Sequence, residues 1–236
     1  TRHGPRYQRH PPGQAGDLPN LLTNPGNDLA LVGGNIPGWT EVVGANWTQR
    51  SGAPVPHSGN YYFFAGVATS AELRQDVDVS SYATDIDAGL VTFDFSGYVR
   101  SYGDGDRSRI VVEYRDAANT AVLGQYDSGD YSQSATWLQL TDSRAAPVGT
   151  RHVRVRLIAT RAAGSNCDGY FDTLSLTARL TQPTSTFRYT GPFTLTNTTT
   201  VTTLAVRDGY QSDRFTNVYT FMPAIAVDPV PGVYYN

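Results

Sequence analysis

The stretch His152-Val153-Arg154-Val155-Arg156-Leu157 alternates polar and apolar side chains at every position. Because successive side chains of a β-strand point to opposite faces, the two valines and the leucine are expected to face a core. The two arginines then lie on the other face, which meets water or a partner. The pattern therefore predicts a half-buried strand.

Strand patterns recur on both sides of this stretch, and turn residues such as those at 101–106 and 127–130 separate them. The chain holds 15 Tyr, 23 Gly and 14 Pro, and aromatic and branched side chains suit a pleated surface. No helical periodicity is long enough for a major helix. The sequence predicts an all-β fold, with strands at 61–64, 73–79, 90–99, 110–114, 137–140, 153–158 and 170–176.

Composition excludes several classes of protein. A length of 236 residues with 39% hydrophobic content fits one large domain or two smaller ones. All 18 basic residues are Arg, and the net charge of −3 argues against nucleic-acid binding by the body of the protein.

Cys167 is the single cysteine and is interpreted as an inert core thiol, so stability must come from burial. No stretch of about 18 apolar residues occurs, so no membrane insertion is expected.

The two ends of the chain differ from its middle. Residues 1–19 are rich in Pro and Gly and offer little to bury, which predicts an extended N-terminal arm. An arm without a core is expected to dock onto a neighbouring subunit, through Arg2, Arg6, Tyr7 and Arg9. Residues 181–186 read as a linker, 187–222 as a small β module and 223–236 as an extended tail. The strands of the small module are expected at 187–189, 193–195, 200–206 and 217–221.

Three motifs carry a family resemblance. They are Asn-Leu-Leu-Thr-Asn-Pro-Gly-Asn-Asp at 20–28 with Gly38-Trp39, His-Ser-Gly-Asn-Tyr-Tyr-Phe at 57–63, and Gly-Tyr-Phe-Asp-Thr-Leu-Ser-Leu at 169–176. In this order they resemble galactose-binding-like modules, which begin N-L-L-x-N-P-G-x-E…G-W. The resemblance implies a jelly-roll β-sandwich over residues 20–180. This family includes carbohydrate-binding modules, the sugar-recognising domain of F-box proteins, and domains of bacteriophage tail and virion proteins.

The resemblance also implies a structural calcium ion. In calcium-binding members, the acidic residue of the first motif and the Asp of the last motif help hold the ion. Asp28 replaces the Glu, and Asp172 matches directly. Calcium takes about six to eight oxygen ligands, and the first and last strands of a jelly roll are neighbours. The alternative is that Asp172 accepts backbone amides at a turn.

Sugar binding needs aromatic platforms beside short polar side chains. Two loops offer both, and interface packing is the alternative role for them. Trp39, Trp47 and Trp137 are interpreted instead as core residues, since they lie beside core positions of the family. The candidate carbohydrate-binding residues are Tyr102, Asp104, Asp106 and Arg107 in one loop, and Tyr126, Asp130 and Tyr131 in the other.

The segment at 189–195 and 200–210 resembles the latter half of the small Ig-like sandwich at the C-terminus of chitobiases. It departs from that family, because the preceding strand with the T-T-D-G-x-x-P-T signature is missing. A sandwich that lacks a strand has an open edge, and open edges pair with other chains. The truncation therefore predicts a homo-oligomer.

Catalysis has little support in the sequence. No G-x-S-x-G, H-E-x-x-H or paired-cysteine motif occurs near any of the four His. We therefore expect a non-enzymatic structural protein of a tailed bacteriophage virion, in its tail, fibre, adhesin or decoration apparatus. Its expected partners are neighbouring virion subunits and host cell-surface glycans. The alternative is a secreted bacterial carbohydrate-binding module of a larger glycan-degrading protein.

Overall fold

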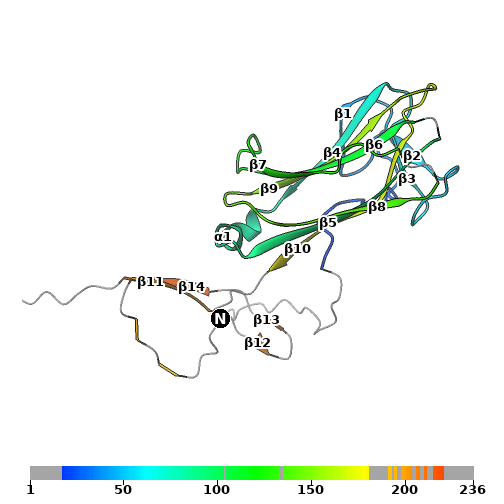
Figure 1. Cartoon of the computed structure of the whole chain (residues 1–236). Coiled ribbons are helices and arrows are strands. Elements are labelled where there is room, and N and C mark those ends of the chain that lie inside the picture. Colours follow the sequence, from blue (N-terminus) through cyan, green and yellow to red (C-terminus); the bar gives the residue numbers. More distant parts are fainter. Residues whose placement is uncertain are drawn as a thin grey trace, which may run out of the picture. The chain divides into compact units, whose positions relative to one another are not determined.

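Two layers of antiparallel strands make up the larger unit of the chain, Asp17–Thr186 (Figure 1). The structure is a computed structural model. It describes residues 18–103, 105–132, 135–180, 191–192, 194–195, 198–203, 206–207, 210–211 and 215–220.

Each layer is a five-stranded sheet. The first sheet has the order β1-β4-β9-β6-β7, and the second has the order β2-β3-β10-β5-β8. The first contains β1 (Thr40–Val43), β4 (Ser70–Asp78), β6 (Arg107–Arg115), β7 (Val122–Asp127) and β9 (His152–Thr160). The second contains β2 (Thr48–Arg50), β3 (Tyr62–Phe64), β5 (Val91–Ser101), β8 (Leu138–Ala145) and β10 (Gly169–Leu180).

The core lies between the two sheets and is built from alternate residues. In β9 the side chains of Val153, Val155 and Leu157 are fully buried, while both arginines between them are half-buried on the outer face. β5 alternates in the same way along its whole length. Each large apolar side chain that is fully buried contributes about 1.5–3 kcal/mol relative to exposure. The prediction of an all-β sandwich is confirmed.

Residues before the first strand join the sandwich at β10. The side chain of Asn20 donates to the carbonyl of Leu174 at 2.9 Å and accepts from the backbone N–H of Leu176 at 3.0 Å. The Leu21 N–H donates to the carbonyl of Leu176 at 2.8 Å. The first motif of the sequence therefore lies beside the last one, as expected of a jelly roll.

Sequence patterns missed β1, β2 and β7. The first two are only four and three residues long, and β7 is the edge strand of its sheet with alternate residues exposed. Short edge strands bury little, so their apolar periodicity is weak. The connection from β4 to β5 holds a short turn, η1 (Ser80–Tyr82), and a short helix, α1 (Ala83–Asp87), whose Ile86 is fully buried.

The described part of the C-terminal region contains two two-stranded ladders. β11 (Thr199–Thr203) pairs with β14 (Phe215–Tyr219), and β12 (Val206–Arg207) pairs with β13 (Tyr210–Gln211). An Ig-like sandwich here stays a prediction. The expected arm through residue 17, the linker, the strand at 187–189 and the tail lie outside the described residues. None of the described helices is long and apolar enough to cross a membrane.

Candidate functional site

Asp106, predicted to meet a sugar, is fully buried. Its Oδ1 accepts the backbone N–H groups of Ala162 at 2.7 Å and Ala163 at 3.3 Å. Its Oδ2 accepts the N–H of Asp168 at 2.6 Å. Asp106 thus joins the loop before β6 to the loop before β10, and a ligand at the surface does not reach it.

The other predicted loop residues come together only in part. Arg107 and Asp130 form an exposed ion pair at 3.5 Å, and the backbone of Tyr131 forms a bridge with β6. Tyr126 is half-buried and packs against Phe95, with ring centroids 6.4 Å apart. Tyr102 is 58% exposed. Asp104 lies outside the described residues.

A larger group of aromatic rings lies on the outer face of the second sheet. Tyr170 of β10 lies directly opposite Phe64 of β3 on one side and Arg100 of β5 on the other. Directly paired residues of neighbouring strands point to the same face, so these three side chains share the outer face. Rings from two loops extend this row. We call the set the aromatic face, and it consists of His57, Tyr62, Phe64, Tyr98, Trp137 and Tyr170.

One half of the aromatic face is formed by loop residues over β5. The His57 ring stacks on Tyr98, with centroids 3.5 Å apart and planes 19° apart. Trp137 meets His57 edge-on at 6.4 Å and Tyr62 edge-on at 5.6 Å. Its indole N–H donates to the carbonyl of Val55 at 3.0 Å. The rings are thus held in place, and the exposed imidazole with the half-buried indole is open to solvent.

This position corrects the interpretation of Trp137 as a core residue. Trp39 and Trp47 are buried in the core as predicted, at 7% and 2% exposure. Trp137 precedes β8 and packs on the outside of the sheet instead. Its ring contacts those of His57 and Tyr62 on the outer face, which the spacing of tryptophans along the chain does not reveal.

The other half of the aromatic face combines rings with charge. The guanidinium of Arg50 lies over Phe64 at 4.6 Å and over Tyr170 at 5.9 Å from the ring centroids. The Tyr170 hydroxyl donates to Asp168 at 2.8 Å, and Arg50 pairs with the same carboxylate at 3.4 Å. Burial raises the pKa of Tyr62 to about 12 and also raises that of Tyr170. Both hydroxyls therefore stay protonated at neutral pH.

Asp28 and Asp172, the predicted calcium ligands, are brought together beside Gly26. A Cβ at Gly26 would lie 2.9 Å from Asp28 Oδ2 and 3.7 Å from Asp172 Oδ1, so both carboxylates face one small space. Backbone N–H groups already donate to several of the carboxylate oxygens that a calcium ion would use as ligands. Asp172 accepts those of His57 and Ser58 through Oδ2, and Asp28 Oδ1 accepts that of Asn60.

The structure brings the two carboxylates together, and backbone amides already donate to their oxygens. Calcium binding here stays a prediction. Burial raises the pKa of Asp172 to about 6, although the hydrogen bonds from the amides oppose this shift. Among the described residues no group of three or more His, Cys, Asp and Glu is arranged around a metal position. A calcium ion here would need further oxygens from the backbone.

The calcium prediction is checked by melting the protein in calcium chloride and in EDTA. If Asp28 and Asp172 bind the ion, calcium is expected to raise Tm, because an ion that binds only the folded state stabilises it. Asp28→Asn is expected to abolish the increase. An equal Tm in both buffers would mean that the two carboxylates serve only to accept amides.

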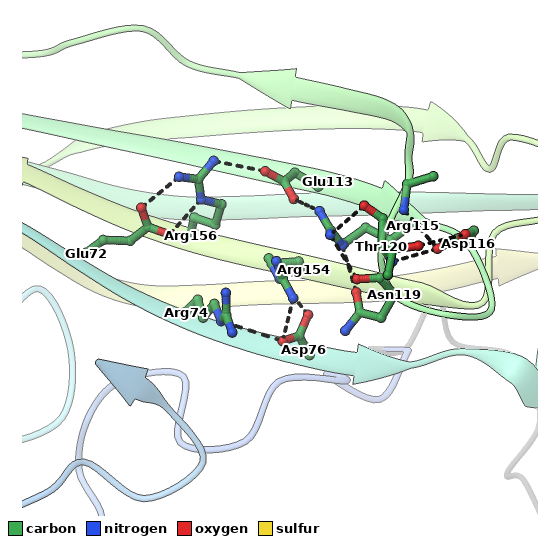
Figure 2. Close-up of polar contacts among 11 residues, drawn as sticks. Glu72, Arg74, Asp76, Glu113, Arg115, Asp116, Asn119, Thr120, Arg154 and Arg156 are labelled. Carbon is green, nitrogen blue, oxygen red and sulfur yellow. Dashed lines mark hydrogen bonds and ion pairs between the residues drawn. The ribbon is translucent and has the colours of Figure 1, made fainter. Parts of the chain in front are cut away.

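The outer face of the first sheet has a different chemistry (Figure 2). Arg156 donates to Glu72 at 2.7 Å and to Glu113 at 2.9 Å, and Glu113 also pairs with Arg115. Arg154 donates to Asp76 at 2.7 Å. These guanidinium and carboxylate groups satisfy one another, so a ligand here would have to displace an existing ion pair. The aromatic face is the stronger candidate for binding.

Known structures share this fold at low sequence identity. A domain of tailspike protein 4 from bacteriophage CBA120 matches 68% of this chain at 15% identity, with a TM-score of 0.51. The match spans only 21% of that tailspike chain. A family 16 carbohydrate-binding module matches 66% of this chain and 99% of its own, at 20% identity and a TM-score of 0.45. The xylan-binding CBM22-2 domain of Paenibacillus barcinonensis Xyn10C matches 62% of this chain and 95% of its own, at 18% identity and a TM-score of 0.43.

The likeness to the tailspike domain concerns the fold alone, and it agrees with the β-sandwich described above. No protein-family model matches the chain. No curated protein matches it either.

Proposed function

We propose that this chain is a non-catalytic glycan-binding module of a bacteriophage virion, and that the aromatic face is its binding surface. The observation that carries the glycan-binding part is the set of fixed aromatic rings beside arginines on the outer face of the second sheet. In this set His57 is exposed, Phe64, Tyr98 and Trp137 are half-buried, and Tyr62 and Tyr170 are fully buried. Sugar rings stack their apolar faces on aromatic side chains, while their hydroxyl groups bond to polar neighbours.

The geometry of the aromatic face favours binding over acid–base catalysis. Asp168 is engaged by Tyr170 and Arg50, and the indole N–H of Trp137 by a backbone carbonyl. These contacts fix rings in position, which lowers the entropy lost on binding. A reducing-sugar assay on the polysaccharides that the protein binds is expected to show no release of new ends.

Trp137→Ala is expected to weaken glycan binding by at least about tenfold, because truncating an aromatic hot-spot anchor typically costs about 2 kcal/mol or more, and about 1.4 kcal/mol corresponds to a factor of ten. The measurement is retardation in native gels that contain xylan, galactan, glucomannan or polygalacturonate. Tyr102→Ala is the matched control, since Tyr102 is an exposed aromatic residue of the loop predicted from sequence. If Tyr102→Ala weakens binding and Trp137→Ala does not, the loops and not the aromatic face form the site.

The virion part of the proposal rests on other features. The arm at 1–19 carries Arg2, Arg6 and Arg9 and little to bury, which suits docking onto a neighbouring subunit. A phage tailspike domain uses the same fold over part of its length. A secreted module of a glycan-degrading protein is the second candidate, since isolated carbohydrate-binding modules also have this architecture.

Sedimentation of the purified chain separates the two candidates. A virion component is expected to sediment as a homo-oligomer. Deletion of residues 1–19 is expected to reduce the number of chains in that oligomer. A monomer at all concentrations would argue for the secreted module.

A further inference from the structure

Arg100 is a half-buried residue of β5 at the centre of the aromatic face. Its Nε atom is buried and has no hydrogen-bond partner. No ion pair to its guanidinium occurs among the residues that the structure describes. Leaving a charged donor unsatisfied is costly, so such a group is expected to have a partner when the protein acts.

A second arginine lies close to Arg100. Tyr170 is the direct cross-strand partner of Arg100, and side chains in such pairs have Cβ atoms about 5 Å apart. The guanidinium of Arg50 lies 5.9 Å from the centre of the same Tyr170 ring. The hydroxyl of Tyr62 is within electrostatic reach of both arginines. The two positive charges are therefore grouped around two tyrosines.

One carboxylate among the described residues forms an ion pair in this group. Asp168 pairs with Arg50 and also accepts the hydroxyl of Tyr170. Arg100 forms no ion pair with any described carboxylate, so its positive charge is not neutralised in this way within the described part of the sheet face. An anion bound there would gain from that charge, and the partial desolvation by the surrounding rings would strengthen the attraction.

We propose that the aromatic face binds a glycan that carries carboxylate groups, with the sugar carboxylate paired to Arg100 and Arg50 and the sugar ring against the neighbouring aromatic side chains. The planar guanidinium fork matches a carboxylate with two parallel hydrogen bonds. The inference rests on the proposed glycan-binding function and defines its ligand class. Uronic acids and sialic acids both supply the required group.

The test uses affinity gels and calorimetry with the full chain and four polymers. Polygalacturonate supplies uronic acid, and polysialic acid supplies sialic acid. Carboxyl-reduced polygalacturonate keeps the sugar ring without the charge, and dextran sulfate supplies charge without a carboxylate. We expect one carboxylated polymer to bind at least ten times more tightly than the reduced polymer and than dextran sulfate. The affinity is also expected to fall with added salt, since screening weakens charge pairing.

Arg100→Gln is expected to lower affinity for the carboxylated polymer at least tenfold and to remove most of the preference for it over the reduced polymer. Its Tm is expected to stay near that of the native chain, because no described contact of the guanidinium is lost. Arg50→Gln is a second variant, expected to act in the same direction. Arg179→Gln is the matched control, since Arg179 lies on the same outer face near the far end of β10 and pairs with Asp94.

The outcomes separate the two levels of the proposal. Equal binding of carboxylated and reduced polymers would overturn the carboxylate inference and leave glycan binding intact. Equal binding of dextran sulfate, or an equal loss in Arg179→Gln, would also overturn it by indicating general attraction to polyanions. Binding to no glycan in this set or on a broad glycan array would overturn the proposed function itself.

Discussion

Replacement of Glu113 by alanine is expected to lower the free energy of unfolding by about 3–5 kcal/mol, the range observed when one partner of a buried ion pair is removed. Glu113 is 6% exposed and joins two arginines, Arg156 at 2.9 Å through Oε1 and Arg115 through Oε2. Arg115 is itself only 8% exposed. In the alanine variant, the other hydrogen bonds that the structure shows for the Arg115 guanidinium go to neutral oxygens of Asn119 and Thr120, and the nearby charge of Asp116 remains. Urea denaturation followed by tryptophan fluorescence measures the loss.

Asp94→Ala is the control for the Glu113 variant. Asp94 also receives hydrogen bonds from an arginine, Arg179 at 3.0 Å, but both side chains are substantially exposed. Exposed pairs contribute about 0–1 kcal/mol. Glu113→Gln keeps an acceptor oxygen and is expected to fall between the two. Equal losses in Glu113→Ala and Asp94→Ala would mean that water already screens the network.

The network also accounts for the burial of both faces of β6. Its last six residues, 110–115, are all buried. The inner positions face the core, and the outer ones are covered by the arginines and the 116–121 hairpin (Figure 2). Periodicity describes the contacts of one strand with one core, and it carries no information about ion pairs between strands far apart in the chain.

The sequence contains a pattern that indicates the aromatic face. The run Tyr61-Tyr62-Phe63-Phe64 places large rings at consecutive positions, and consecutive side chains of a strand point to opposite faces. Only one of these faces meets the core. Phe63 takes the core, so Phe64 and Tyr62 must lie on the outer face. Tyr170 beside Phe171 repeats the signal. Aromatic rings on both faces of two strands predict a second aromatic cluster, on the outer face of the sheet.

What the sequence could not supply is the set of partners from distant loops. His57 and Trp137 are 80 positions apart in the chain, yet their rings meet on the outer face, where His57 stacks on Tyr98 of β5 and Trp137 contacts Tyr62 of β3. The same limit applies to Asp106, whose position in a Gly-Asp turn is typical of an exposed residue. Its burial depends on the loop at 161–168 folding over it. Short-range patterns therefore identified seven strands of the sandwich, and the motif resemblance identified the jelly roll. The positions of loop side chains depend on long-range contacts that neither of these describes.

Asp106→Ala is expected to cause the second large loss of stability, because it leaves the buried N–H group of Asp168 and the part-buried N–H groups of Ala162 and Ala163 without this carboxylate. Each buried donor that loses its acceptor costs about 1–3 kcal/mol. The effect should concentrate in the loop before β10, so these three amides are expected to exchange hydrogen faster than the core of β5 does. Asp106→Asn retains one acceptor oxygen and is expected to lose less stability.

Cys167 provides an independent readout of that loop. The thiol is fully buried, and burial raises its pKa to about 12, so it should react slowly with a thiol reagent in the native protein. Opening of the loop in Asp106→Ala exposes the sulfur and restores an ordinary pKa, so the reaction is expected to accelerate at least tenfold. Asp130→Ala, which removes only an exposed ion pair with Arg107, is the control and should react at the native rate. A native rate in Asp106→Ala would show that the loop holds its position without the carboxylate, because contacts such as the 2.7 Å hydrogen bond from Cys167 N–H to the Gly66 carbonyl then suffice.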